Sequence, residues 1–184
     1  DKIFMYTYNP NGKAKTLVLK ETFSVKPGSG PRHLVFNPNG TFVHLLQEMD
    51  GTLTTLDYTN DKLTNIQELN VTPNLLGGKH GGADIHFSND GKFLYATNRG
   101  DANTISVFRV HANGMLSMVQ QISTQGSGPR NFIMGPNDAF VLVANQNTNN
   151  IAIFRRDKTT GFLTYTSRKI ELCQPVFLAF TANK

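Results

Sequence analysis

Three arginines and one glutamate stand where they could bind an anion together. Arg32 follows a Gly-Pro pair, Glu48 comes later in the same segment, Arg99 precedes a glycine, and Arg130 again follows Gly-Pro. Guanidinium groups bind carboxylate and phosphate through two parallel hydrogen bonds. A carboxylate among them can hold the guanidinium groups in place or orient a water molecule. These residue types therefore predict a site for a small anionic ligand, provided that the fold brings them together.

Four similar segments recur along the chain: PRHLVFNPNG, GADIHFSNDG, PRNFIMGPND and PVFLAF. They begin at Pro31, Gly82, Pro129 and Pro175, with a period of about 47 residues. A second apolar run follows each of the first three, as in TFVHLLQE from Thr41, and two more runs complete each unit. Turn clusters such as NPNG, SNDG and TTG separate the runs. Each unit therefore predicts four short strands.

Four antiparallel strands repeated at this period are typical of the blades of a β-propeller, so we expect an all-β fold. The first 25 residues match only the last two strands of a unit, and PVFLAF matches only the first. We expect one propeller portion over residues 1–184, with three complete blades and two partial ones. The expected blades are 1–29 (partial), 30–79, 80–127, 128–173 and 174–184 (partial, the ring-closing strand).

A propeller needs about 4–8 blades to close its ring. An open arc would leave strand edges and apolar blade faces exposed. We therefore expect the chain to be one part of a longer polypeptide, whose missing N-terminal half pairs with the last strand and completes the ring.

The geometry of a hairpin predicts where the polar residues meet. In an antiparallel pair, the start of the first strand lies beside the end of the second, so Arg32 is expected opposite Glu48. The same construction brings four more polar residues to this end of the central channel: Arg99, Arg130, Asn145 and Gln146. A structural ion pair between Arg32 and Glu48 is the plainer alternative, since strand ends are usually polar. The excess of arginine favours a pocket for an anion.

Composition narrows the class of protein further. The 184 residues carry a net charge of +5, and the basic residues form no run longer than a pair. This spread argues against nucleic acid or an anionic membrane as a partner. Cys173 is the single cysteine and no histidine spacing matches a metal motif, so we expect no metal and no cofactor. No apolar run reaches the length of a membrane helix, and we expect a cytoplasmic protein.

Three segments carry a family resemblance: GPRHLVFNPNGTFVHLLQE, HFSNDGKFLYATNRGDANTISVFRV and GPRNFIMGPNDAFVLVANQNTNNIAIFRR. They resemble the lactonase family of seven-bladed propellers, which includes bacterial 6-phosphogluconolactonases and fungal carboxymuconate lactonizing enzymes. The resemblance spans nearly the whole chain and implies a parent of about 330 residues. It implies hydrolysis of a sugar lactone, first of all 6-phosphogluconolactone, as in the pentose phosphate pathway. A carboxymuconate-type lactonizing enzyme and a non-catalytic binding scaffold remain as alternatives.

The resemblance also implies roles for individual residues. The family's proposed site has a histidine, two arginines and a glutamate at the channel mouth, and Arg32, Glu48 and Arg99 match the last three. The histidine belongs to an earlier blade and has no counterpart in this chain, so the chain alone is expected to be inactive. We expect Arg32 to stabilise an oxyanion, Arg99 and Arg130 to hold a phosphate, and Glu48 to orient the water or the histidine.

The remaining polar candidates are expected to bind the substrate or to pack within blades. The expected substrate-binding residues are His33, Arg130, Asn145 and Gln146. His44 and His86 are expected to pack within blades.

Overall fold

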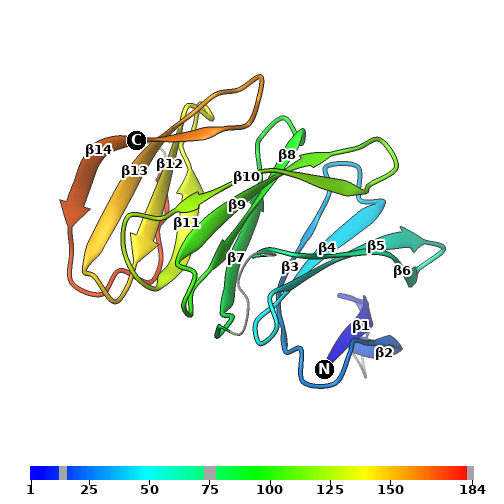
Figure 1. Cartoon of the computed structure of the whole chain (residues 1–184). Coiled ribbons are helices and arrows are strands. Elements are labelled where there is room, and N and C mark those ends of the chain that lie inside the picture. The colour runs from blue at the N-terminus through cyan, green and yellow to red at the C-terminus, as the bar shows by residue number, and fades with distance from the viewer. Residues whose placement is uncertain (13–15, 73–77, 182–184) are drawn as a thin grey trace.

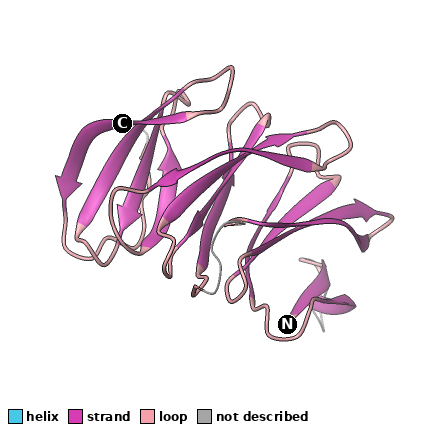
Figure 2. Ribbon diagram, in the orientation of Figure 1, coloured by secondary structure: helices cyan, strands magenta, loops and turns pink. Residues whose placement is uncertain are grey.

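The computed structural model describes residues 1–12, 16–72 and 78–181, and these residues form strands and loops with no helix (Figures 1 and 2). Three four-stranded antiparallel sheets stand side by side, and a two-stranded hairpin lies beside the first of them. The hairpin contains β1 (Lys2–Tyr8) and β2 (Leu17–Ser24). The sheets contain β3 (Pro31–Phe36), β4 (Phe42–Gln47), β5 (Thr52–Thr59) and β6 (Lys62–Asn70); β7 (Gly82–Phe87), β8 (Phe93–Asn98), β9 (Thr104–Val110) and β10 (Leu116–Ser123); and β11 (Pro129–Met134), β12 (Phe140–Asn145), β13 (Asn150–Arg156) and β14 (Leu163–Glu171).

The predicted fold class is confirmed, because each sheet consists of four successive antiparallel strands, as in a propeller blade. Residues 175–181, which contain the expected ring-closing segment PVFLAF, form no strand within the described part of the chain, so their pairing in a closed ring stays a prediction. A strand needs a neighbouring backbone for its hydrogen bonds, and no described segment forms a ladder with these residues. Leu178 instead donates its backbone N–H to Oδ1 of Asn131 on β11, at 2.8 Å. Where one blade ends and the next begins stays a prediction.

The turn between the first two strands of each sheet needs a residue with positive φ. Gly40 and Gly91 fill this place in the first two sheets, with φ of 70° and 68°. Glycine adopts this conformation without steric cost. The third sheet has Asp138 there, with φ of 61°. Its carboxylate accepts a hydrogen bond from the backbone N–H of Asn89 in the neighbouring sheet, at 3.0 Å, so the same turn also ties two sheets together.

Two apolar cores lie between successive sheets. One joins the first and second sheets around Leu46, Leu53 and Phe108. The other joins the second and third sheets around Tyr95 and Phe132. Side chains at alternating positions of each strand point into these apolar cores, which explains why the strand sequences are apolar at every second position or throughout. Burial of these side chains is the main force that holds the sheets side by side.

A glutamine clamp repeats between the outer strands. Gln67 on β6 donates from Nε2 to the carbonyl oxygen of Leu116 at 3.0 Å and accepts from the N–H of Leu116 at 2.7 Å. Gln120 on β10 makes the same two hydrogen bonds with Leu163, at 3.0 and 2.7 Å. Each glutamine amide therefore hydrogen-bonds both the N–H and the C=O of one residue in the next sheet, which fixes the two sheets relative to each other.

His44 packs within the first sheet, as expected. Its ring is fully buried, lies edge-on to Phe87 with 5.4 Å between ring centroids, and shares a 3.1 Å hydrogen bond with Thr55. Nε2 of His44 has no partner among the described residues. Burial lowers the pKa of His44 from 6.5 to about 4, because a charged imidazolium would lose its hydration.

This shift predicts a loss of stability in mild acid. The unfolded chain binds a proton at His44 near pH 6.5, whereas the folded protein resists it until about pH 4. The stabilisation is therefore complete above pH 6.5 and falls by at most about 3 kcal/mol as the pH drops to 4. Urea unfolding of the full-length protein between pH 4 and 7 measures this slope. In the His44→Gln variant the unfolding free energy should depend less on pH, by the contribution of about one proton. An unchanged pH dependence would contradict the lowered pKa of His44.

Candidate functional site

Arg32, Glu48 and Arg99 meet at one end of the sheets, as the hairpin geometry predicts. Nη1 of Arg32 lies 3.3 Å from Oε2 of Glu48, and Nη2 of Arg99 donates to Oε1 of the same carboxylate. The guanidinium side chains are each 19% exposed and the carboxylate is 35% exposed. One carboxylate therefore holds two arginines from neighbouring sheets at a rim that solvent reaches.

A bulge at the start of β3 allows Arg32 to reach this place. The register between β3 and β4 pairs Pro31 with Gln47 and then His33 with Leu46, which leaves Arg32 as the extra residue. Bulges commonly re-aim a side chain next to a functional site. Nε of Arg32 donates to the carbonyl oxygen of Ala83 on β7 at 2.9 Å. The arginine thus bridges two sheets with its Nε and holds Glu48 with its terminal nitrogen.

Glu48 is ionised at neutral pH. Burial opposes its charge, but the hydrogen bond from Arg99 and the charges of Arg32 and Arg99 outweigh that effect and lower its pKa. A carboxylate held in this way is a weak proton acceptor. Its geometry instead suits it to fix the two guanidinium groups, each of which keeps further N–H donors for a ligand.

A cavity of about 460 Å³ opens beside Arg32 along the inner strands. Arg130 lines it from β11, His33 lines it from β3, and the apolar side chains of Val176 and Phe177 border it. Within the part of the chain that the structure describes, Arg130 makes no ion pair. Arg99 does not line this cavity, since Glu48 and the carbonyl oxygen of Gly81 occupy its guanidinium. Of the two arginines expected to hold a phosphate, Arg130 alone is placed with Arg32 at the cavity.

Asp84 also lines this cavity, and no expectation from the sequence pointed to it. It lies on β7, is 4% exposed, and accepts a hydrogen bond from the backbone N–H of Phe132 at 3.1 Å. His33 and His86 lie against its two oxygens. His86 is therefore not a packing residue as expected, because its side chain is 43% exposed and lines the cavity. A carboxylate within the inner strand GADIHF was the available signal.

The structure does not bring Asn145 to the site. Its side chain is fully buried, and Nδ2 donates to the carbonyl oxygen of Thr124 at 2.9 Å. Gln47 and Asn98 hold the same position at the end of the second strand and are also buried. Successive side chains of a strand face opposite sides, so this position faces the seam between sheets. Gln146 follows it, is half-buried, and matches Glu48 in position, with a role that stays a prediction.

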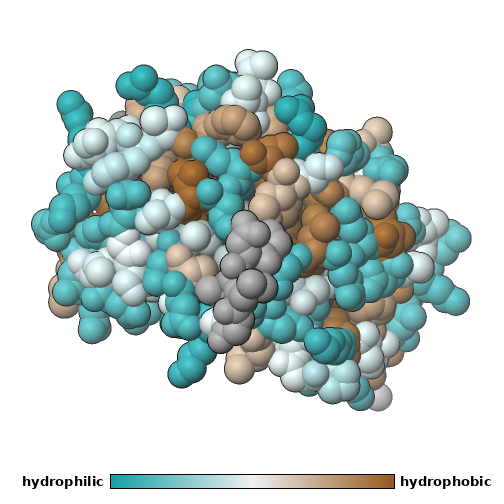
Figure 3. All heavy atoms as spheres, in the orientation of Figure 1, coloured by the Kyte–Doolittle hydropathy of each residue, from teal (hydrophilic) through white to brown (hydrophobic). Residues whose placement is uncertain are grey.

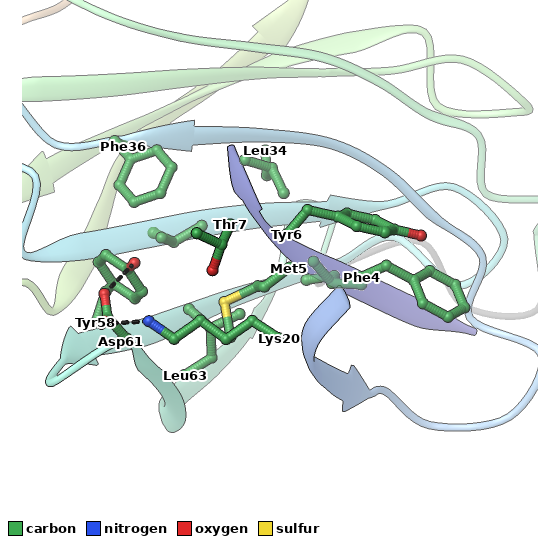
Figure 4. A pocket seen from close by; sticks show the side chains of 12 residues that line it. Phe4, Met5, Tyr6, Thr7, Lys20, Leu34, Phe36, Tyr58, Asp61 and Leu63 are labelled. Atoms are coloured by element: carbon green, nitrogen blue, oxygen red, sulfur yellow. Dashed lines mark hydrogen bonds and ion pairs between the residues drawn. The ribbon is translucent and has the colours of Figure 1, made fainter. Parts of the chain in front are cut away.

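A second cavity, of about 440 Å³, lies away from these groups, between the β1–β2 hairpin and the first sheet. Figure 4 shows Phe4 and Tyr6 of β1 beside Leu34 and Phe36 of β3 around an apolar space. Its polar contacts are confined to one corner, where Asp61 accepts hydrogen bonds from Lys20 and Tyr58. This groove therefore lacks the convergent charged groups that the rim around Glu48 provides.

The contact between Glu48 and Gly82 leaves no room for a side chain. The N–H of Gly82 donates to the carbonyl oxygen of Glu48 at 3.0 Å, and a Cβ on Gly82 would lie 2.3 Å from the carbonyl oxygen of Gln47. We expect Gly82→Ala to lower the free energy of unfolding by about 1–3 kcal/mol.

Gly135→Ala serves as the control, because the nearest atom to its Cβ would be 3.4 Å away. It should change the free energy of unfolding by less than about 0.5 kcal/mol in the same urea titration. Equal stability of the two variants would show that the seam beneath Glu48 can open freely.

The fold and this rim define a β-propeller in which Arg32, Glu48 and Arg99 gather at the end where the first strand of a sheet begins and its second strand ends. The family model described as "Lactonase, 7-bladed beta-propeller" matches residues 1–180. The chain belongs to this family.

Two relatives and one solved structure are similar to this chain. It is 35% identical over 181 residues to the 6-phosphogluconolactonase of Bacillus subtilis (strain 168), covering 96% of this chain and 50% of that protein. It is 43% identical over 145 residues to the 6-phosphogluconolactonase of Formosa agariphila, covering 78% and 41%. The solved structure of the periplasmic gluconolactonase of Pseudomonas aeruginosa matches with a TM-score of 0.92 and 36% identity, covering 99% of this chain and 51% of that chain. The chain spans about half the length of the relatives it matches.

Proposed function

We propose that the full-length protein containing this chain hydrolyses a sugar lactone, and that 6-phosphogluconolactone is its substrate. The observation that carries the proposal is the Arg32–Glu48–Arg99 cluster beside a cavity that Arg130 also lines, with no ion pair to Arg130 among the described residues. Two relatives that share more than a third of their aligned residues with this chain are named 6-phosphogluconolactonase. Both lines of support concern a small, negatively charged lactone.

In this proposal the cluster and the cavity divide the work between them. Attack of water on the lactone carbonyl gives a tetrahedral intermediate with a negative oxygen, which fixed donors stabilise. Arg32 supplies these donors, because Glu48 and Ala83 hold its guanidinium in a fixed orientation. Arg130 binds the phosphate, since it lines the same cavity and its charge has no partner among the described residues.

A further part of the same polypeptide completes the ring in this proposal. The relatives are about twice as long as the matched region, and β1 has no second neighbour among the described strands. The apolar groove between β1 and the first sheet would pack against the remaining strands of that blade (Figure 4). Apolar side chains also reach the surface in several separate brown patches in Figure 3, and large exposed patches usually mark an interface.

Gluconolactone without the phosphate is the second candidate substrate. The structural similarity to a periplasmic gluconolactonase favours it. The two substrates imply different uses of Arg130, which has no phosphate to bind in the second case.

We also propose a cytoplasmic location for the protein if its substrate is the phosphorylated lactone, whereas the similar gluconolactonase is described as periplasmic. No helix of the described residues is long and apolar enough to cross a membrane.

The test is an assay of the full-length protein with both lactones, corrected for their spontaneous hydrolysis. The proposal predicts acceleration with a kcat/KM at least tenfold higher for the phosphorylated lactone. In the Arg130→Gln variant this preference should disappear while turnover of gluconolactone persists. A protein that accelerates neither reaction would refute the lactonase proposal, and a preference that survives in Arg130→Gln would refute the role of Arg130.

A further inference from the structure

The inner strands hold a carboxylate that accepts hydrogen bonds on every side. Oδ1 of Asp84 lies 3.1 Å from Nδ1 of His33 and 3.1 Å from the N–H of Ile85. Oδ2 lies 3.0 Å from Nε2 of His86 and 2.6 Å from Nδ2 of Asn131. These contacts come from three neighbouring sheets, so Asp84 is fixed at the centre of the cavity wall.

Asp84 is charged in this setting. Burial opposes its ionisation, but the hydrogen bonds from His33 and His86 outweigh the burial and hold the pKa of Asp84 well below its usual range. An ionised carboxylate only accepts hydrogen bonds. Nδ1 of His33 therefore carries the proton that it shares with Asp84, and Nε2 keeps its lone pair in the neutral ring.

The two histidines present different atoms to the cavity. Nε2 of His33 makes no hydrogen bond with the described residues, and the side chain is 44% exposed. Nε2 of His86 hydrogen-bonds Asp84, which leaves only Nδ1, the ring nitrogen nearest its own backbone. The ring of His86 also packs edge-on against Phe132, with 4.8 Å between centroids. Of these two rings, His33 is thus the one whose outer nitrogen has no partner among the described residues.

His33 also stands next to the group that would stabilise the intermediate. It follows Arg32 in the bulge of β3, and both side chains line the cavity. Arg32 contacts the backbone of Ala83 while His33 contacts the side chain of Asp84, so two successive residues of β3 face two successive residues of β7. A base and an oxyanion donor are thereby placed side by side.

We propose that His33, oriented by Asp84, is the general base of the lactone hydrolysis. This inference rests on the proposed function, and it places a base within this chain rather than in another part of the protein. A histidine whose Nδ1–H is held by a buried carboxylate presents Nε2 to the reacting water, which is the arrangement of the base in Ser-His-Asp hydrolases.

Hydrolysis then passes through one tetrahedral intermediate. Nε2 of His33 takes a proton from water, the water oxygen bonds to the lactone carbonyl carbon, and the carbonyl electron pair moves onto its oxygen beside Arg32. The intermediate then expels the ring oxygen, which takes the proton back from Nε2 as the carbon–oxygen bond breaks. The products are a hydroxyl group and a carboxylic acid, which ionises in water. Glu48 is a poorer base, because two arginines hold its charge.

The closing experiment compares His33→Gln and His86→Gln in the full-length protein, with initial rates of lactone hydrolysis corrected for the spontaneous reaction. Both histidines contact Asp84 and are equally exposed, so the pair separates a base from a structural contact. His33→Gln should lower kcat about 10²–10⁴-fold, and His86→Gln less than about tenfold. In the His33→Ala variant the ring is missing beside Asp84, so added imidazole can occupy that space and should restore part of the rate.

Asp84→Asn tests the positioning role through kcat and KM measured separately. Loss of the carboxylate removes the acceptor that orients the ring of His33, so kcat should fall at least about tenfold while KM changes less than about threefold. Circular dichroism melting checks that this variant folds; if it does not, the two histidine variants and the rescue by imidazole decide alone.

A wild-type protein that accelerates no aldonolactone refutes the proposed function and the dyad together. An active wild type with a His33→Gln variant at more than a third of its rate overturns the dyad alone. Equal losses in His33→Gln and His86→Gln, without rescue by imidazole, also overturn it and assign both rings to the support of Asp84.

Discussion

Replacing Arg32 with alanine in the full-length protein is expected to lower kcat/KM for 6-phosphogluconolactone about 10²–10³-fold, the usual cost of losing one oxyanion donor. Arg32 both contacts Glu48 and lines the cavity. Its loss removes the donor and also leaves the charge of Glu48 with Arg99 alone. Arg32→Lys should recover only part of the rate, because an ammonium group keeps the charge but not the fork that contacts Ala83 and Glu48.

Arg168→Ala is the control for a general effect of charge. Arg168 is exposed on the outermost strand, β14, and lies outside the cavity beside Arg32. Its rate should stay within about twofold of wild type. Steady-state assays with all three variants decide the matter, and an Arg32→Ala protein as active as Arg168→Ala would contradict the assignment.

The largest effect on stability is expected at Arg156. Its side chain is fully buried between the second and third sheets, where Nε donates to the hydroxyl of Tyr95 at 2.7 Å and Nη1 to Asp138 at 3.3 Å. The guanidinium carbon lies 5.5 Å from the ring centroid of Phe93. Arg156→Ala leaves Asp138 as an uncompensated charge and should lower the free energy of unfolding by about 3–5 kcal/mol.

Two further variants identify the cause of this loss. Arg155→Ala removes the neighbouring exposed arginine and should change stability by less than about 0.5 kcal/mol. Asp138→Gly keeps the positive φ that glycine provides in the other two turns but removes the carboxylate. Combined with Arg156→Ala, it should cost less than the sum of the single changes, since no buried charge is then left alone. Strict additivity in urea titrations would show that the two groups do not interact.

The repeat made the fold predictable from the sequence. Each unit of about 47 residues marks its four strands with turn residues, and the antiparallel hairpin alone places Arg32 beside Glu48. Residues 175–181 have the residue types of a strand but no described backbone beside them as a partner, so the ring-closing strand stays a prediction. Strand propensity cannot supply that partner.

The site was predictable only where the hairpin fixes the position. Arg99 was expected at the rim and is there, but its pairing with Glu48 depends on how two sheets pack against each other. Asn145 was expected at the rim but is buried, because successive side chains at the end of β12 face opposite sides of the sheet. A shift of one residue in the register therefore decides whether a side chain faces the rim or the seam between sheets. Asp84 was missed because its importance comes from donors on three sheets, which no local pattern of residues reveals.

The most direct test of the account is a crystal structure of the full-length protein with 6-phosphogluconate, the product of the proposed reaction. We expect the product in the cavity along the inner strands, with its carboxylate at Arg32 and within hydrogen-bond distance of Nε2 of His33, and its phosphate at Arg130. Product bound in the groove between β1 and β3, or on the outer faces of the sheets, would contradict it.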